Sequence, residues 1–372
     1  MEYCNMKILR VSSDLYPAFV GGIALHVHEL SVMQSKMGHD VTVYTSIWTN
    51  EPLYEDRGDY DVIRFKGFTI FRNSITLKLL SALISNAKNY DVVHAHSQLY
   101  CSTLFCVIGK RIKKFPLIIT NHGLVSQTVP LWIQKIYMMT IGSFVLKSAD
   151  YIITYTIDEK KLLVDYGVDP SKIIIIHNGI NVEKFLIPLN VDKKKQILWI
   201  GKYVPGKGVE YLVEGFADFS HNYPDYSLLM IGRGPGKDMI CNKIDQLSLN
   251  QKIKMVDFIP NDELQIIYEE SMIFISPSLA EGVPKTMLEA MVCGLPVIST
   301  DLPQLVDIVE GCGIIIPCRD PSAICHALEQ MTTDPQFMAQ CGENGRTKVL
   351  SNYDWRDTVE KTNELFTKLI SS

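Results

Sequence analysis

Two glutamates with seven residues between them mark the stretch of this sequence best suited to binding a phosphorylated ligand. The run E-G-V-P-K-T-M-L-E begins at Glu281 and ends at Glu289. It follows an apolar run, 273–276, that predicts a strand, and Pro284 predicts the first turn of a helix, where its missing N–H would have no partner anyway. Backbone N–H groups at such a helix start point outward and attract phosphate. One carboxylate could then reach each end of a bound molecule.

The wider pattern, P-S-x-x-E-G-x-P-x-x-x-L-E-A-M, resembles the signature of the retaining glycosyltransferases of family 4. The resemblance implies an α/β chain with the GT-B fold, two Rossmann-like doubly wound parallel-sheet domains facing across a cleft. It implies that Glu281 contacts the hydroxyls of the donor sugar and that Glu289 contacts the ribose. The donor-binding residues that it implies between them are Gly282, Val283, Pro284, Lys285 and Thr286. The alternative is a surface loop followed by an amphipathic helix with two solvated glutamates.

The composition is that of an ordinary globular protein. At 372 residues the chain predicts two domains, and its net charge of -5 gives no reason to expect a nucleic-acid partner. Its nine cysteines form no C-x-x-C pair, so we expect reduced thiols rather than a disulfide framework. No apolar run reaches membrane-spanning length, and the N-terminus has no apolar signal-peptide region. We expect a cytoplasmic protein, soluble or at most peripheral at the inner face of the membrane.

The first half of the chain begins with a strand, a glycine-rich turn and a helix. Residues 7–12 predict a buried strand, Gly21 and Gly22 follow, and a helix is expected over about 24–36. Glycine lets a backbone approach a ligand closely, although a Gly-Gly pair can also be a simple tight turn. The pair matches the N-terminal glycine loop of the family, which implies a place over the donor phosphates.

Histidines follow two further strands. Alternation along the predicted strand 91–96 places His94 and His96 on one face. A metal site is conceivable but lacks a third ligand nearby, so we favour a polar strand end in the cleft, with His96 lining the acceptor side. His122 follows the predicted strand 116–120, at the end where ligands of open α/β sheets bind. The family resemblance implies contact of His122 with the donor sugar, whereas a structural loop histidine is the alternative.

A second sheet is predicted to begin at 196–200, and the loop after it carries two lysines. The run G-K-Y-V-P-G-K-G, from Gly201 to Gly208, precedes a helical pattern over 209–219. It resembles the family's G-R-x-x-x-x-K-G, which implies that Lys202 and Lys207 neutralise the donor diphosphate. Lysine does so as a point charge, without the bidentate fork of arginine. The alternative is a strand-to-helix loop with solvated lysines.

Later stretches match the family less closely. Gly232 belongs to a G-x-G-P turn after the strand 228–231, and Phe258 and Ile259 follow the segment that would cradle the base. Asp257 replaces the usual glycine there, and Pro303 and Gln304 stand where family glycines are expected. These differences leave the base open and predict an altered loop near the sugar or the acceptor.

The predicted domains are an N-terminal, acceptor-side domain over 1–188, a nucleotide-sugar-binding domain over 189–352, and a C-terminal helix over 353–372 that crosses back to the first. The linker is expected at 188–195. A basic cluster at 110–114 and an apolar, aromatic segment at 130–146 are compatible with a surface that meets lipid. A solvated helix end and a buried helix explain the same residues.

The resemblance implies transfer of a hexose-type sugar from a UDP- or GDP-sugar to a hydroxyl, with the anomeric configuration retained. The implied catalytic residues are Glu281, Lys207, Lys202 and His122. No D-x-D run or other obvious metal-binding stretch occupies a suitable strand end, so we expect no metal cofactor, and the lysines and helix amides would stabilise the leaving diphosphate. The expected acceptor is a glycan, a polysaccharide precursor or a lipid-linked saccharide. Two alternatives remain: a catalytically idle nucleotide-sugar-binding subunit and a nucleotide-sugar epimerase.

Overall fold

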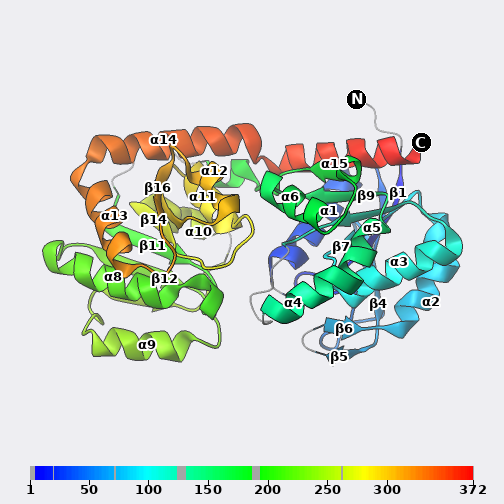
Figure 1. The fold of residues 1–372 in the computed structure, drawn as a ribbon, viewed down its shortest axis with the longest axis horizontal. Helices are drawn as coiled ribbons and strands as arrows, with labels where there is room; N and C mark the ends of the chain where they lie inside the picture. The colour runs from blue at the N-terminus through cyan, green and yellow to red at the C-terminus, as the bar shows by residue number, and fades with distance from the viewer. Residues whose placement is uncertain are drawn as a thin grey trace. The chain divides into compact units, whose positions relative to one another are not determined.

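The computed structural model divides the chain into two compact α/β units (Figure 1). It describes residues 5–19, 21–70, 73–123, 131–186, 193–260 and 263–371. The first unit comprises Met1–His177 and Thr358–Ser372, and the second comprises Asn178–Asp357.

The first unit contains an eight-stranded sheet in the order β10-β9-β8-β7-β1-β2-β4-β3. All neighbouring strands are parallel except β3 and β4. Its strands are β1 (Lys7–Val11), β2 (Asp40–Ser46), β3 (Tyr54–Asp56), β4 (Asp61–Phe65), β7 (Val92–His96), β8 (Leu117–Thr120), β9 (Tyr151–Thr154) and β10 (Ile173–Ile175). A separate hairpin pairs β5 (Phe68–Ile70) with β6 (Asn73–Ile75). The strand order reverses beside β1, which places a topological switch point between β1 and β7.

Helices bury both faces of this sheet. They are α1 (Gly22–Lys36), α2 (Leu77–Asn86), α3 (Cys101–Lys113), α4 (Leu131–Tyr137), α5 (Ser143–Lys147), α6 (Ile157–Asp165) and the part of α15 (Trp355–Ile370) from Thr358 onward. Alternate residues of β1 enter different cores: Leu9 packs in one apolar cluster and Ile8 in the other. Phe366 of α15 joins the cluster of Ile8. In Figure 1 the red α15 accordingly lies beside the blue β1.

The second unit contains a six-stranded parallel sheet in the order β13-β12-β11-β14-β15-β16. Its strands are β11 (Gln196–Ile200), β12 (Ser227–Ile231), β13 (Ile253–Val256), β14 (Ile273–Ser276), β15 (Val297–Thr300) and β16 (Gly313–Ile316). Its helices are α7 (Val182–Phe185), α8 (Val209–Asn222), α9 (Lys237–Gln246), α10 (Leu264–Glu270), α11 (Lys285–Val292), α12 (Pro303–Val309), α13 (Pro321–Thr333) and α14 (Pro335–Asn352). Because β12 and β14 flank β11, the switch point lies between β11 and β14.

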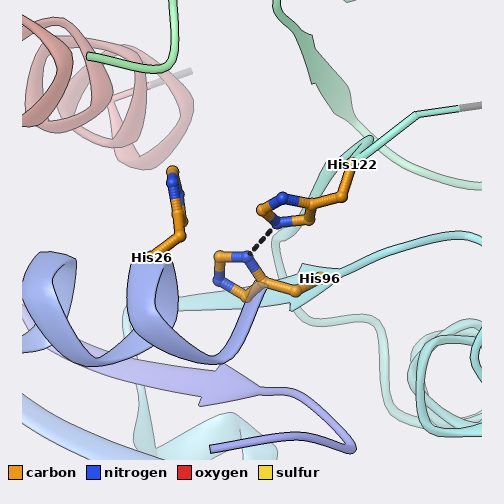
Figure 2. Close-up of side chains that lie close together, drawn as sticks. All are labelled: His26, His96 and His122. Carbon is orange, nitrogen blue, oxygen red and sulfur yellow. Dashed lines mark hydrogen bonds between the residues drawn. The ribbon is translucent and has the colours of Figure 1, made fainter. Parts of the chain in front are cut away.

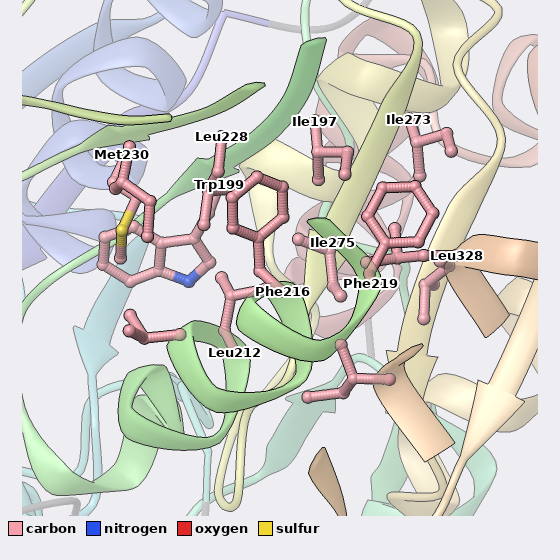
Figure 3. Close-up of a cluster of buried hydrophobic side chains, with 14 of the residues drawn as sticks. Ile197, Trp199, Leu212, Phe216, Phe219, Leu228, Met230, Ile273, Ile275 and Leu328 are labelled. Atoms are coloured by element: carbon pink, nitrogen blue, oxygen red, sulfur yellow. The ribbon is translucent and has the colours of Figure 1, made fainter. Parts of the chain in front are cut away.

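The core of the second unit fixes β11 and α8 against each other. Trp199 of β11 is 2% exposed, and Phe216 and Phe219 of α8 are fully buried against the same sheet face (Figure 3). A Cβ placed on Gly215 would lie 2.5 Å from the carbonyl oxygen of Pro321, so α8 and α13 pack at close range. Aromatic side chains of this size dominate the burial energy of a core.

The division between the units falls earlier than the predicted limit at 188. Ile180 forms a β-bridge with Asp354, and the ring of Phe185 meets that of Tyr268 at 5.9 Å, so this segment packs with the second unit. The predicted linker, 188–195, lies outside the described residues up to 192. At the C-terminal end of the chain, residues from Thr358 onward belong to the first unit. There Asn363 of α15 accepts a hydrogen bond from Gln34 of α1 at 2.6 Å.

Candidate active site

Two loops meet at the switch point of the second sheet. The loop 201–208 joins β11 to α8, and the loop 277–284 joins β14 to α11. The carbonyl oxygen of Gly206 accepts hydrogen bonds from the amides of Leu279 at 2.9 Å and Ala280 at 3.2 Å. Gly208 has φ +60°, and a Cβ there would lie 2.1 Å from the carbonyl oxygen of Pro277. Only glycine therefore fits, and it lets the two loops lock together.

The interlocked loops bring together two of the predicted site residues. The ammonium of Lys207 forms an ion pair with the carboxylate of Glu281, and their side chains are only 15% and 14% exposed. Ser278 Oγ donates to the same carboxylate oxygen at 3.3 Å, and Gln304 donates to the backbone carbonyl of Glu281. Lys202, on the same loop as Lys207, is exposed. A cation and an acceptor of hydrogen bonds thus stand side by side at the strand ends.

The helix α11 opens directly after Pro284, as predicted. The amides of Met287 and Leu288 donate to the carbonyl oxygen of Pro284 at 3.1 and 3.3 Å. The amides of Lys285 and Thr286 precede this ladder, at the positive end of the helix dipole. Gly282 is half-buried and Val283 is buried, which fixes the approach to the helix.

Glu289 lies inside α11 and is buried. Its carboxylate accepts a hydrogen bond from the hydroxyl of Tyr268 at 2.8 Å, and that hydroxyl also reaches the carbonyl of Thr286 at 3.2 Å. Burial, together with the neighbouring Glu289 carboxylate, raises the pKa of Tyr268 well above its ordinary value. Contact of Glu289 with a ribose remains a prediction.

The ends of β12 and β13 supply the remaining predicted donor residues. Gly232 has φ +157°, and a Cβ there would lie 1.7 Å from the carbonyl oxygen of Gly201, so the ends of β12 and β11 are in backbone contact. Phe258 is 58% exposed, with the guanidinium of Arg233 at 5.4 Å from its ring centroid. Ile259 beside it is half-buried. An exposed aromatic ring at a strand end offers a stacking surface to a flat ligand.

The predicted glycine loop of the first unit lies at the start of α1. Gly21 precedes the helix in an extended conformation, and Gly22 is exposed, with open space where a Cβ would stand. The chain itself therefore does not require glycine at Gly22. A close approach of ligand to this backbone remains a prediction.

The histidines at the ends of β7 and β8 do have a third partner, contrary to the expectation from sequence. His94 and His96 share one face, with ring centroids 4.3 Å apart. His26 of α1 and His122 after β8 join His96, so that one nitrogen of each lies within 4.8 Å of the others (Figure 2). Helix periodicity gave no sign of this, because the contact depends on how α1 packs beside β7.

A hydrogen-bonded chain connects part of this cluster. His96 Nδ1 lies 2.9 Å from His122 Nε2, and the hydroxyl of Tyr155 lies 2.8 Å from His122 Nδ1. Burial and the nearby histidines and Arg10 lower the pKa of His96 well below its usual range. His96 is therefore a neutral imidazole at neutral pH. Of the predicted first-unit residues, the structure brings His96 and His122 together.

Five residues of these two sites were not predicted to take part: His26, Tyr155, Tyr268, Ser278 and Gln304. Ser278 carried a signal, since it stands in the quoted P-S run before Glu281. Gln304 was noted only as a departure from the family glycines. The other three contact the sites through tertiary packing, which single-sequence patterns do not reveal.

One of the two interpretations of the segment 131–146 was a buried helix, and the structure contradicts it. Large apolar side chains are exposed along it: Trp132, Ile133, Ile136, Met139 and Ile141. Pro130, the first residue of the predicted segment, lies outside the described residues. The basic cluster lies at the end of α3, where Lys110, Arg111 and Lys114 border a depression of about 740 Å³ with Phe144. Within the described part of the chain, no helix combines the length and the apolar character needed to cross a bilayer.

Two family models match this chain, and together they include most of both units. The sequence model of the family described as Glycosyltransferase Family 4 matches residues 20–184, and that described as Glycosyl transferases group 1 matches residues 183–348. The chain is 26% identical to the UDP-Gal:alpha-D-GlcNAc-diphosphoundecaprenol alpha-1,3-galactosyltransferase of Escherichia coli, over 100% of this chain and 99% of the relative.

Solved structures share the fold. The sucrose-phosphate synthase of Thermosynechococcus elongatus superposes with a TM-score of 0.82 at 22% identity, over 99% of this chain and 100% of the other. The Anabaena protein HepE in complex with UDP gives a TM-score of 0.80 at 17% identity, over 98% and 100%. At these sequence identities the two structures support the fold alone.

Proposed function

Since this chain belongs to the group 1 glycosyltransferases and has the GT-B fold, we propose that it moves a hexose-type sugar from a nucleoside-diphosphate sugar to an acceptor hydroxyl. The relative from Escherichia coli is named for transfer of galactose from UDP to a diphosphoundecaprenol-linked sugar. The HepE structure holds UDP. Both favour a UDP-sugar as the first donor to test and a lipid-linked saccharide as the first acceptor.

The observation that carries the proposal is the pairing of Lys207 with Glu281 at the switch point of the second sheet. Ligands of open α/β sheets bind at this place. An incoming diphosphate competes with Glu281 for the Lys207 ammonium, and the released carboxylate can then accept hydrogen bonds from sugar hydroxyls. Donor binding thereby converts an internal ion pair into two ligand contacts.

The proposed chemistry is a metal-independent transfer with retention. The bond between the anomeric carbon and the diphosphate oxygen breaks, and the acceptor oxygen forms the new bond on the same face. The acceptor proton passes to the departing phosphate oxygen. Lys202, Lys207 and the amides at the start of α11 stabilise the charge that develops on the diphosphate. His122 would bind the sugar, and Glu281 orients it rather than acting as a nucleophile.

A screen of UDP- and GDP-sugars tests the donor. A specific ligand raises stability by RT ln(1 + [L]/Kd), so the preferred base and sugar give the largest rise in unfolding temperature. Proton NMR of the product then reports the anomeric configuration, and an inverted product would contradict the proposed chemistry. Incubation with donor alone separates the alternatives: an epimerase changes the sugar, whereas an idle binding subunit yields no product with any acceptor.

We also propose that the first unit contacts an anionic membrane surface. Trp132 and Ile136 of α4 and Met139, which follows that helix, are exposed by 66%, 56% and 65%, and Lys135 also lies on α4. An exposed apolar strip beside basic residues is typical of interfacial helices. Flotation with phosphatidylglycerol vesicles tests this. Trp132→Ser with Met139→Ser should abolish binding, whereas Met239→Ser, an exposed methionine of the second unit, should not; equal binding by all variants would refute the contact.

A further inference from the structure

We propose that His26, His96 and His122 form a reversible binding site for a transition-metal ion in the first unit. The three imidazoles come from α1, β7 and the loop after β8, and Figure 2 shows them converging on a common space. Their ring centroids lie 4.9 Å (His26 to His122), 5.6 Å (His26 to His96) and 5.2 Å (His96 to His122) apart. One nitrogen from each ring lies within 4.8 Å of the other two.

The donor set determines the class of ion. Three neutral imidazole nitrogens without a carboxylate suit Zn²⁺, Co²⁺, Ni²⁺ or Cu²⁺, whereas Mg²⁺ and Ca²⁺ prefer oxygen ligands. Three histidine ligands, with water completing the coordination, would match the arrangement of open zinc sites. His26 and His96 are buried, and His122 is half-buried, so exchange of the ion would take place from the side of His122.

The hydroxyl of Tyr155 orients one of the three ligands, His122. With a metal at His122 Nε2, the proton of that ring lies on Nδ1 and donates to the hydroxyl oxygen of Tyr155, which stands 2.8 Å away. Burial raises the pKa of Tyr155 well above its usual range, so the phenol stays neutral. Such an outer partner fixes the orientation of a ligating imidazole and typically accounts for ~10–100-fold in metal affinity.

Two features limit the affinity and make binding reversible. A metal at His96 Nδ1 leaves the proton on Nε2, which is buried and has no hydrogen-bond partner among the described residues. The buried Arg10 guanidinium also lies close enough to lower the pKa of His96, and it repels any cation at the site. The ion is therefore an exchangeable occupant of the site rather than a permanent structural metal.

Occupancy has a consequence for the transfer reaction, and this step rests on the proposed function. His122 is the residue predicted to contact the donor sugar, and a metal would occupy its Nε2. The ion and the sugar then compete, so Zn²⁺ should inhibit transfer and a chelator should restore it. If Zn²⁺ binds but does not inhibit transfer, His122 does not bind the sugar. That result would refute the role of His122 in donor binding but not the metal site.

Binding itself is tested without any activity assay. The full chain is stripped with chelator and titrated with Co²⁺, and the visible spectrum and the metal content after equilibrium dialysis are measured. We expect one ion per chain, with a spectrum of nitrogen and oxygen ligation and without the strong thiolate charge-transfer absorption that the free cysteines would give. Mg²⁺ should not compete, whereas Zn²⁺ should displace Co²⁺.

Variants then identify the ligands. His26→Gln and His122→Asn should abolish saturable binding, and Tyr155→Phe should weaken it by ~10–100-fold. His28→Gln is the matched control, because His28 lies on the same helix but its ring bonds to Tyr60 at 2.7 Å instead. Thermal unfolding without metal shows which variants are folded. If His26→Gln is unfolded, metal binding by His122→Asn decides the test, because His122 is only half-buried. The proposal would be overturned if the unmodified chain showed no saturable binding of Co²⁺, or if His122→Asn bound Co²⁺ as well as the unmodified chain does.

Discussion

Gly208→Ala provides a direct test of how the two site loops are held together. The residue has φ +60°, a conformation that costs alanine about 1–2 kcal/mol. The added Cβ would also stand 2.1 Å from the carbonyl oxygen of Pro277. That carbonyl cannot move easily, because Leu279 donates to Gly206 and Thr300 donates to the carbonyl of Ser278 at 2.6 Å. Forcing a methyl group into such packing costs roughly 1–3 kcal/mol more.

We therefore expect Gly208→Ala to lower the free energy of unfolding of the second unit by about 2–5 kcal/mol. Gly311→Ala is the matched control in the same unit, since Gly311 has φ +75° but open space at the Cβ position. It should lose only the backbone part, about 1–2 kcal/mol. Native-state hydrogen exchange of the β11 amides measures both losses within this unit.

The same pair of variants predicts a difference in turnover. Relief of the contact shifts the loop of Lys207 relative to that of Glu281, and a displacement of about 1 Å can cost ~10²-fold in rate. Gly311→Ala should retain nearly normal turnover. Equal losses of stability in the two variants would refute the close approach at Gly208. A large loss of stability with unchanged turnover would refute its role in positioning the ion pair.

Four further predictions concern the site. Lys207→Ala should lower turnover by ~10²–10³ while the unfolding temperature stays near that of the parent, and near-normal turnover would contradict its role at the diphosphate. Glu281→Ala should lower turnover more than nucleotide affinity measured by calorimetry, whereas equal losses would indicate simple anchoring. Tyr268→Phe should cost roughly 1.5–3 kcal/mol of unfolding free energy, because it removes the hydrogen bond to the buried Glu289 carboxylate, and a neutral effect in urea titration would argue against that bond. Chelator treatment should not lower the transfer rate, and a loss reversed by a divalent ion would contradict metal-independent transfer.

Much of the framework follows from local sequence. The strands β11 and β14 begin and end at the predicted residues, because each is a short apolar run followed by a turn residue. The start of α11 was likewise predicted from Pro284, whose geometry suits a first helical turn. These features depend on neighbouring residues alone.

Other features depend on contacts between distant segments, and sequence patterns did not reveal them. The pairing of Lys207 with Glu281 spans 74 positions, and only the adjacency of β11 and β14 makes it possible. His26 meets His96 and His122 because of how α1 packs, so the third ligand was missed. The apolar residues of 131–146 fit a buried helix as well as an exposed one, and the structure shows the exposed faces of Trp132 and Met139.

The most direct test is a crystal structure of the protein with UDP or GDP bound. The account predicts that the diphosphate lies at the ends of β11 and β14, against Lys202, Lys207 and the first amides of α11, with Lys207 drawn away from Glu281. A nucleotide bound elsewhere, with the ion pair between Lys207 and Glu281 undisturbed, would contradict it.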